Sequence, residues 1–191
     1  DLVKLQKKGK IRNIGMCNMD TERLKMMVEA GIPVVSNQAQ YSVFDRRPER
    51  TLLDYSAPHG IYTFCYGTLA GGFLDERYMG KVYEAPETRS QVKYMQIIED
   101  SLGWDGMQKL LVLLRDIAGK YGVSVANVAV QYILRQKSVG AVMVGTRNSR
   151  HVASNLRTLQ FDLSQEDMDC IRAFLEQYPT PQGECYELER T

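Results

Sequence analysis

The sequence has few of the residues that ligate metals or build disulfide frameworks. Only four cysteines and two histidines occur among its 191 residues, and no Cys-x-x-Cys pair is present. The cysteines lie far apart, at Cys17, Cys65, Cys170 and Cys185. We therefore expect no metal site, no set of structural disulfides, and a reducing, cytoplasmic environment.

The sequence also lacks long apolar runs and an excess of one charge. Lysine and arginine total 24, and aspartate and glutamate total 23. This balance provides no basic field for nucleic acid or an anionic membrane, and the apolar runs are too short to span a bilayer. Residues 1–10 are charged and helical in pattern, unlike a signal peptide, and they contain no methionine. We therefore expect a soluble chain that is a piece of a longer protein.

What the sequence does contain is an alternation of strand-like and helical segments. The predicted strands cover residues 11–16, 33–35, 61–65 and 141–144. The first predicted helix ends at residue 9. The other predicted helices cover residues 20–31, 48–55, 92–98, 110–121, 125–134, 149–156 and 164–175. Such alternation indicates the α/β class with a parallel sheet. Two architectures fit the pattern: a small doubly wound domain, or a partial TIM barrel, half of a (β/α)₈ fold that needs about 250 residues when complete.

Polar residues mark where several of these helices begin. Asp20 and Ser124 precede apolar helical patterns, and Ser164 with Asp167 fits a capping box. By contrast, residues 67–106 are long for a connection between a strand and a helix. Connections of this length are usually functional lids or disordered.

Ligands of parallel α/β proteins bind beyond the carboxyl ends of the strands, so the residues there are the first candidates for a site. In sequence order they are Cys17, Asn18, Asn37, Gln38, Tyr41, Tyr66, Gly67, Thr68, Gly145, Thr146, Arg147 and Asn148. Taken singly, each amide is most simply a turn residue and each aromatic ring a core residue. Their joint placement on one face of the sheet favours a binding site.

These side chains suit a ligand with a planar ring, a carboxamide and phosphates. Asn18 and Gln38 provide hydrogen-bond donors and acceptors, and Tyr66 provides a flat face for stacking. Gly145 allows close backbone approach before a helix whose N-terminus favours anions. Residues 140–160 include no acid, whereas Arg147 lies there, which predicts a phosphate pocket.

Four ordered segments resemble the aldo-keto reductase family. Residues 9–18 (GKIRNIGMCN) resemble its fifth-strand segment, and residues 36–41 (SNQAQY) its sixth. Residues 66–74 (YGTLAGGFL) resemble the loop after the seventh strand, and residues 144–147 (VGTR) with 155–156 (NL) resemble the eighth strand and its helix. The resemblance implies that residues 1–178 form the C-terminal half of a (β/α)₈ barrel, followed by a polar tail at 179–191.

The resemblance also implies NADP(H) as the cofactor, with contacts assigned position by position. Asn18 and Gln38 would hold the nicotinamide carboxamide, and Tyr66 would stack on its ring. The residues implied at the pyrophosphate are Gly67, Thr68, Leu69 and Arg77. Those implied at the adenosine end and its 2′-phosphate are Thr146, Arg147, His151 and Asn155, and the cofactor site is also expected to include Cys17 and Gly145. Three positions depart from the family pattern: Cys17 replaces a common serine beside Asn18, Thr68 a common proline, and His151 a common arginine or glutamine.

The family's catalytic Asp, Tyr, Lys and His come from the first four strands, and none of the eleven tyrosines here matches that motif. We therefore assign no catalytic residue. The implied activity is reduction of a small-molecule carbonyl substrate, or oxidation of an alcohol, by hydride transfer, with this chain inactive alone. Its expected partners are a missing N-terminal half or a second copy, and neither nucleic acid nor a membrane. Two alternatives stay open: a non-catalytic cofactor-binding or scaffold subunit, and an α/β domain that binds no cofactor.

Overall fold

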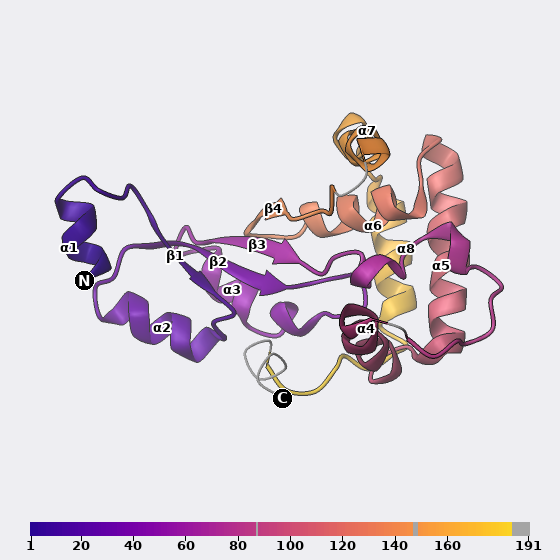
Figure 1. Cartoon of the computed structure of the whole chain (residues 1–191), viewed down its shortest axis with the longest axis horizontal. Helices are drawn as coiled ribbons and strands as arrows, with labels where there is room; N and C mark the ends of the chain where they lie inside the picture. The colour runs from indigo at the N-terminus through magenta and orange to yellow at the C-terminus, as the bar shows by residue number, and fades with distance from the viewer. Residues whose placement is uncertain (87, 147–148, 185–191) are drawn as a thin grey trace.

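The centre of the molecule is a parallel sheet of four strands in the order β1-β2-β3-β4. The computed structural model describes residues 1–86, 88–146 and 149–184, apart from the side chain of Arg150. The strands are β1 (Ile14–Cys17), β2 (Val34–Gln40), β3 (Tyr62–Tyr66) and β4 (Val139–Val142). Helices separate successive strands (Figure 1). The predicted α/β class with a parallel sheet is confirmed.

Strand β2 is longer than predicted, because the segment 36–40 that follows its apolar start is also part of the sheet. Residues 36–40 pair in register with residues 62–66 of β3, and β1 pairs with the opposite edge. Parallel neighbours on both sides satisfy the backbone of this polar segment, so the strand continues. Buried Asn37 exchanges two hydrogen bonds with the backbone of Met19. Strand β1 begins at Ile14 rather than Ile11, and β4 begins at Val139 rather than Ala141.

The helices follow the predicted order, with changes at their ends. They are α1 (Leu2–Lys7), α2 (Thr21–Glu29), α3 (Leu52–Ser56), α4 (Arg89–Glu99), α5 (Gly103–Tyr121), α6 (Val125–Leu134), α7 (Ser149–Arg157) and α8 (Gln165–Leu175). Four short 3₁₀ turns are η1 (Arg47–Glu49), η2 (Ala70–Gly72), η3 (Glu76–Tyr78) and η4 (Thr158–Gln160). The single helix predicted at 48–55 is divided between η1 and α3. Helix α4 starts earlier than predicted because Thr88 and Gln91 form a capping box.

The predicted caps show how far local chemistry decides helix starts. Asp20 and Ser124 cap α2 and α6 as predicted. Ser164 caps α8 by accepting a 3.1 Å hydrogen bond from the backbone N–H of Asp167. However, the Ser164 N–H donates to the hydroxyl of Tyr121 on α5 rather than to Asp167, so the predicted capping box is half formed.

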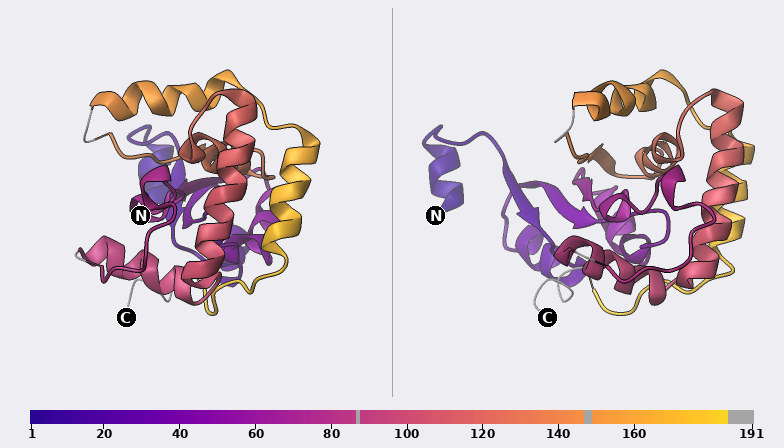
Figure 2. Two further views of the ribbon diagram at one scale, coloured as in Figure 1. Left: turned by 90° about the vertical axis from the view of Figure 1, so that its right-hand side faces the viewer. Right: turned by 45° about the vertical axis from the view of Figure 1, so that its right-hand side comes forward.

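Two hydrophobic clusters hold the helices to the sheet. The larger lies between β3 and helices α4, α5, α6 and α8, and α5 and α8 stand side by side in Figure 2 as the pink and yellow helices. The smaller joins α2, α3 and the first two strands, and its buried members are Leu24, Val34, Ala39, Leu52 and Ile61. Burial of apolar side chains on this scale is the main stabilising contribution in a domain.

One face of the sheet is open to solvent in the part of the chain that the structure describes. On β3, Tyr62 is 58% exposed and Phe64 is 38% exposed. Cys17, Gln38 and Phe64 are neighbours in register, so their side chains share this face. Parallel sheets are normally covered on both faces. An open face is therefore what the inner wall of a partial barrel would show.

Candidate functional site

Four candidate side chains meet where β1, β2 and β3 end. Cys17 closes β1 and pairs with Gln38 of β2, while Tyr66 closes β3 and pairs with Gln40. Gln38 lies within its strand, two residues before the end, and not after it as predicted. The structure still brings Gln38 next to Asn18, because the backbone N–H of Asn18 donates to the Gln38 carbonyl at 2.7 Å.

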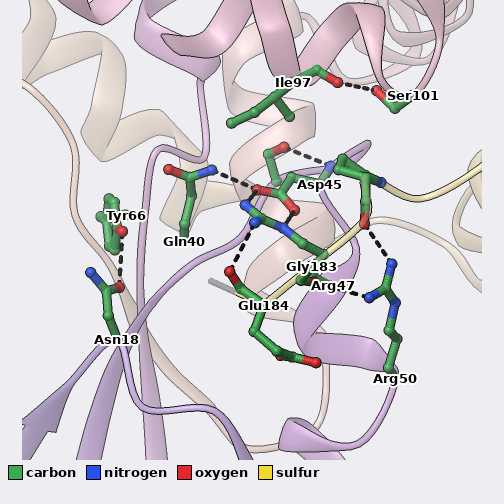
Figure 3. A network of polar contacts seen from close by, with 12 residues as sticks. Asn18, Gln40, Asp45, Arg47, Arg50, Tyr66, Ile97, Ser101, Gly183 and Glu184 are labelled. Atoms are coloured by element: carbon green, nitrogen blue, oxygen red, sulfur yellow. Dashed lines mark hydrogen bonds and ion pairs between the residues drawn. The ribbon is translucent and has the colours of Figure 1, made fainter. Parts of the chain in front are cut away.

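A side-chain hydrogen bond links the last residue of β3 to the residue that follows β1. The Tyr66 hydroxyl donates to the amide oxygen of Asn18 at 2.9 Å (Figure 3). Asn18 is buried and adopts a positive φ of 54°, a conformation that asparagine tolerates better than most residues. Because the Asn18 oxygen accepts from Tyr66, its amide nitrogen is directed away from the ring as a donor. A planar ring and an oriented amide thus lie side by side.

The turn after β3 is built from glycines and fixed to the core. Gly67 has a φ of 68°, and its carbonyl accepts from the Ala70 N–H at 2.8 Å. Thr68 is buried, and its hydroxyl donates to the Tyr41 carbonyl at 3.0 Å. The Thr68 side chain therefore anchors the turn, and only its backbone remains to contact a ligand. Leu69 packs partly against the larger core.

Arg77 extends from the far end of this turn. Its guanidinium group donates to the Gly72 carbonyl at 3.3 Å and lies 4.9 Å from the centroid of the Tyr78 ring. A cavity of about 250 Å³ opens beside it, with Gln91 and Trp104 among the lining residues. A guanidinium group at a glycine-rich turn is a suitable contact for a phosphate.

The residues after β4 form a separate part of the candidate site. Gly145 and Thr146 are exposed, and the Asn155 side chain donates to the Gly145 carbonyl at 3.4 Å. His151 is exposed one helical turn before Asn155 on α7. Arg147, which the sequence places at the 2′-phosphate, lies outside the described residues, as does residue 148.

A buried ion pair behind β2 escaped the sequence analysis. Arg47 and Asp45 make two hydrogen bonds of 2.7 Å with side chains that are 0% and 2% exposed, and Gln40 donates to the same carboxylate at 2.6 Å (Figure 3). Arg47 and Arg50 also donate to backbone carbonyls of residues 181–184. The start of the predicted polar tail is therefore bound to the loop after β2. The only sequence signal was the charge cluster at 45–47.

Tyr41, the first residue after β2, is held in a buried pair. Tyr41 is fully buried and its hydroxyl donates to Glu49 at 2.7 Å. Burial, with the neighbouring Glu49 carboxylate, raises the pKa of Tyr41 well above its ordinary value. Burial also raises the pKa of Glu49, although the hydrogen bond from Tyr41 opposes that rise. A buried phenol that is difficult to ionise is poorly placed to exchange protons with a substrate.

The described residues carry neither a metal cluster nor a membrane span. Across the ranges 1–86, 88–146 and 149–184, no three His, Cys, Asp or Glu side chains gather as a metal site requires. Over the same ranges, no helix combines the length and apolarity needed to cross a membrane. Cys17, Cys65 and Cys170 are free thiols.

The fold and the strand-end residues define a partial-barrel α/β protein with a polar site at the carboxyl ends of its strands. The aldo/keto reductase family model matches residues 1–176, and the chain belongs to that family. It is 30% identical over 135 residues to flagellar radial spoke protein 5 of Chlamydomonas reinhardtii, covering 68% of this chain and 25% of that protein. It is 26% identical over 179 residues to the NADH-specific methylglyoxal reductase of Escherichia coli (strain K12), and this match covers 92% of this chain and 52% of that protein.

A solved structure shows the same fold. The aldo/keto reductase from Klebsiella pneumoniae, in complex with NADP and acetate, superposes with a TM-score of 0.66 at 23% identity. The match covers 95% of this chain and 53% of that one. This chain therefore spans about half of that reductase, about half of the Escherichia coli relative, and a quarter of the Chlamydomonas relative.

Proposed function

We propose that this chain supplies the cofactor-binding half of an NADP(H)-dependent oxidoreductase, which reduces carbonyl groups or oxidises alcohols by hydride transfer. The observation that carries the proposal is the bond between Tyr66 and Asn18, which sets a flat ring beside an oriented amide. A nicotinamide presents a planar ring and a carboxamide, and such a pair matches both. The cofactor supplies the hydride chemistry, and the protein positions it.

The remaining candidate residues would hold the rest of the dinucleotide. The turn at residues 67–69 and Arg77 would contact the pyrophosphate. Thr146, His151 and Asn155 would contact the adenosine end. The choice between NADP and NAD depends on Arg147, and one relative is named as NADH-specific. Arg147→Glu is therefore expected to abolish a preference for NADPH over NADH, because it places a like charge beside the 2′-phosphate.

We further propose that this chain does not turn over substrate alone. Carbonyl reduction needs a positioned proton donor. The Tyr41 hydroxyl is buried against Glu49, and the Tyr66 hydroxyl donates to Asn18. The donor would come from a second half-barrel that covers the open face of the sheet and contributes much of the substrate pocket. Cys17, Cys65 and Cys170 would remain thiols in a reducing, cytoplasmic environment.

A second candidate function is a non-catalytic subunit that binds the cofactor or acts as a scaffold. The relative with 30% identity is named as a flagellar radial spoke protein, so a structural name occurs among the matches. The two functions differ in one measurable property. An enzyme half should oxidise NADPH in the presence of an aldehyde once the complementary half-barrel is added, whereas a scaffold subunit should bind NADPH without consuming it.

The first experiment is a thermal melt of this chain with and without saturating NADPH. A ligand at about 100 times its Kd stabilises a folded protein by roughly 2.7 kcal/mol. A cooperative melt that moves upward supports the proposed cofactor site. A cooperative melt that NADPH and NADH both leave unchanged contradicts it, and then the chain is better described as an α/β domain without a cofactor.

A further inference from the structure

Helix α4 lies directly against the glycine turn that follows β3. The ring of Tyr94 packs on both Gly67 and Gly71: a Cβ atom at Gly67 would lie 2.9 Å from Tyr94 Cε1, and one at Gly71 would lie 2.8 Å from Tyr94 Cδ2. Both glycines have positive φ, 68° and 64°. Glycine is therefore required at both positions for conformation and for space. This packing fixes where the side chains of α4 stand relative to the turn.

The packing places a cation at each end of the turn. The ammonium group of Lys93 lies 5.4 Å from the centroid of the Tyr66 ring and 5.7 Å from that of Tyr94, at the end where Gly67 begins the turn. Arg77 donates to the carbonyl of Gly72 at the other end. Two cations across a glycine turn complement a doubly charged, extended anion.

We propose that Lys93 binds the diphosphate of the dinucleotide at the phosphate next to the nicotinamide ribose, opposite Arg77. The inference rests on the proposed function, because Tyr66 and residues 67–69 are its nicotinamide and diphosphate contacts. Over an aromatic ring at an exposed site, the ammonium group makes only a weak contact. A charge-assisted hydrogen bond to phosphate is stronger. Lys93 therefore exchanges its contact with Tyr66 for the phosphate when the cofactor binds.

The test is the NADPH affinity of Lys93→Met as a function of KCl concentration, followed by the fluorescence of bound NADPH. Lys25→Met is the matched control, since Lys25 is exposed on α2 and the same charge is removed. Lys93→Met is expected to weaken NADPH binding about tenfold and to make the affinity less dependent on salt. Lys25→Met should leave the affinity unchanged. Lys93→Arg keeps the charge and should retain most of the wild-type NADPH affinity.

Adenosine 2′,5′-bisphosphate, a probe without the nicotinamide-side phosphate, localises the contact. Lys93→Met should bind this probe as wild type does, whereas Arg77→Met should weaken both ligands. NADPH binding by Lys93→Met that equals or exceeds wild type would overturn the role of Lys93 and leave the proposed function intact. Failure of the wild-type chain to bind NADPH would instead overturn the proposed function. A thermal melt of each variant shows that it is folded before binding is compared.

Discussion

The hydroxyl of Tyr66 and the amide oxygen of Asn18 form a hydrogen bond of 2.9 Å between the ends of two strands that are not neighbours in the sheet. Strand β2 lies between them, and the Gln38 carbonyl of that strand accepts from the Asn18 backbone. The backbone of Asn18 is therefore held by β2, and its side-chain amide is oriented by Tyr66 of β3. Such a bond costs no reorganisation when a ligand arrives, which is the condition for a preorganised site.

The first prediction concerns this bond. Tyr66→Phe keeps the flat ring and removes the hydroxyl, so the Asn18 amide oxygen loses the hydrogen bond from Tyr66. We expect NADPH affinity to fall roughly fivefold and the free energy of unfolding to fall by about 1 kcal/mol. Fluorescence titration and urea unfolding measure the two effects. Tyr62→Phe is the control, because Tyr62 is exposed on the same strand. Equal effects of the two substitutions would show that the bond does not orient the amide.

Features with local causes were predictable from sequence. Asp20 and Ser124 cap their helices because a side chain bonds to a backbone N–H within the same turn. The four strand-helix units and their parallel order follow from periodicity and chain order. The candidate residues at the strand ends were predictable for the same reason, since consecutive parallel strands bring their carboxyl ends to one edge.

Features that depend on distant partners were not predictable. Gln38 lies inside a strand because β1 and β3 pair with a polar segment whose sequence resembles a loop. Lys93 reaches Tyr66 only because α4 folds back over the glycine turn. Arg47 donates to the Glu184 carbonyl, 137 residues further along the chain. No window of sequence contains these contacts.

The second prediction is a pH-dependent effect of Glu49→Gln. Burial raises the folded-state pKa of Glu49 above its unfolded value, despite the hydrogen bond from Tyr41. Its contribution to stability is therefore fully present below the unfolded pKa and is lost as pH rises through the folded pKa. Glutamine mimics the protonated form and still accepts from Tyr41. We expect Glu49→Gln to stabilise the protein by on the order of 1 kcal/mol at pH 8 and to be neutral near pH 4. Urea unfolding at both pH values measures this, and a constant difference would contradict it.

The third prediction concerns Asp167, whose pKa is shifted in the opposite direction to that of Glu49. Burial alone would raise the pKa of Asp167, but hydrogen bonds from Lys120, Tyr121 and Ser164 outweigh burial and lower it. Its contribution to stability is present above the unfolded pKa and is lost as pH falls through the folded pKa. We expect Asp167→Asn to cost about 1–3 kcal/mol at pH 7. The cost should shrink below pH 4 in urea unfolding. A cost that grows on acidification would show that the carboxylate is not stabilised in the folded state.

The fourth prediction concerns the buried pair of Arg47 and Asp45. Arg47→Met removes both hydrogen bonds of the guanidinium group from the Asp45 carboxylate, which is 2% exposed and still accepts from Gln40. Removing one member of a buried ion pair costs about 3–5 kcal/mol. The double variant Asp45→Asn, Arg47→Met removes the charge and should recover a large part of that cost. Urea unfolding of the two single variants and the double variant gives the coupling energy. Additive costs would show that the pair does not act as a unit.

The last prediction separates backbone strain from packing at the glycine turn. Gly71 and Gly31 both have positive φ, 64° and 72°, so alanine at either position costs roughly 1–2 kcal/mol. At Gly31 nothing lies within 4 Å of the new methyl group, whereas at Gly71 the methyl group meets the ring of Tyr94 on α4. Gly71→Ala should therefore destabilise the protein more than Gly31→Ala. It should also weaken NADPH binding, because the methyl group pushes the Tyr94 ring away from the turn and displaces α4, which carries Lys93. The thermal melts and NADPH titrations of the two variants are compared directly. If the two substitutions lower the stability equally and neither alters NADPH binding, the packing of Tyr94 on the glycine turn does not fix the position of α4 or of Lys93.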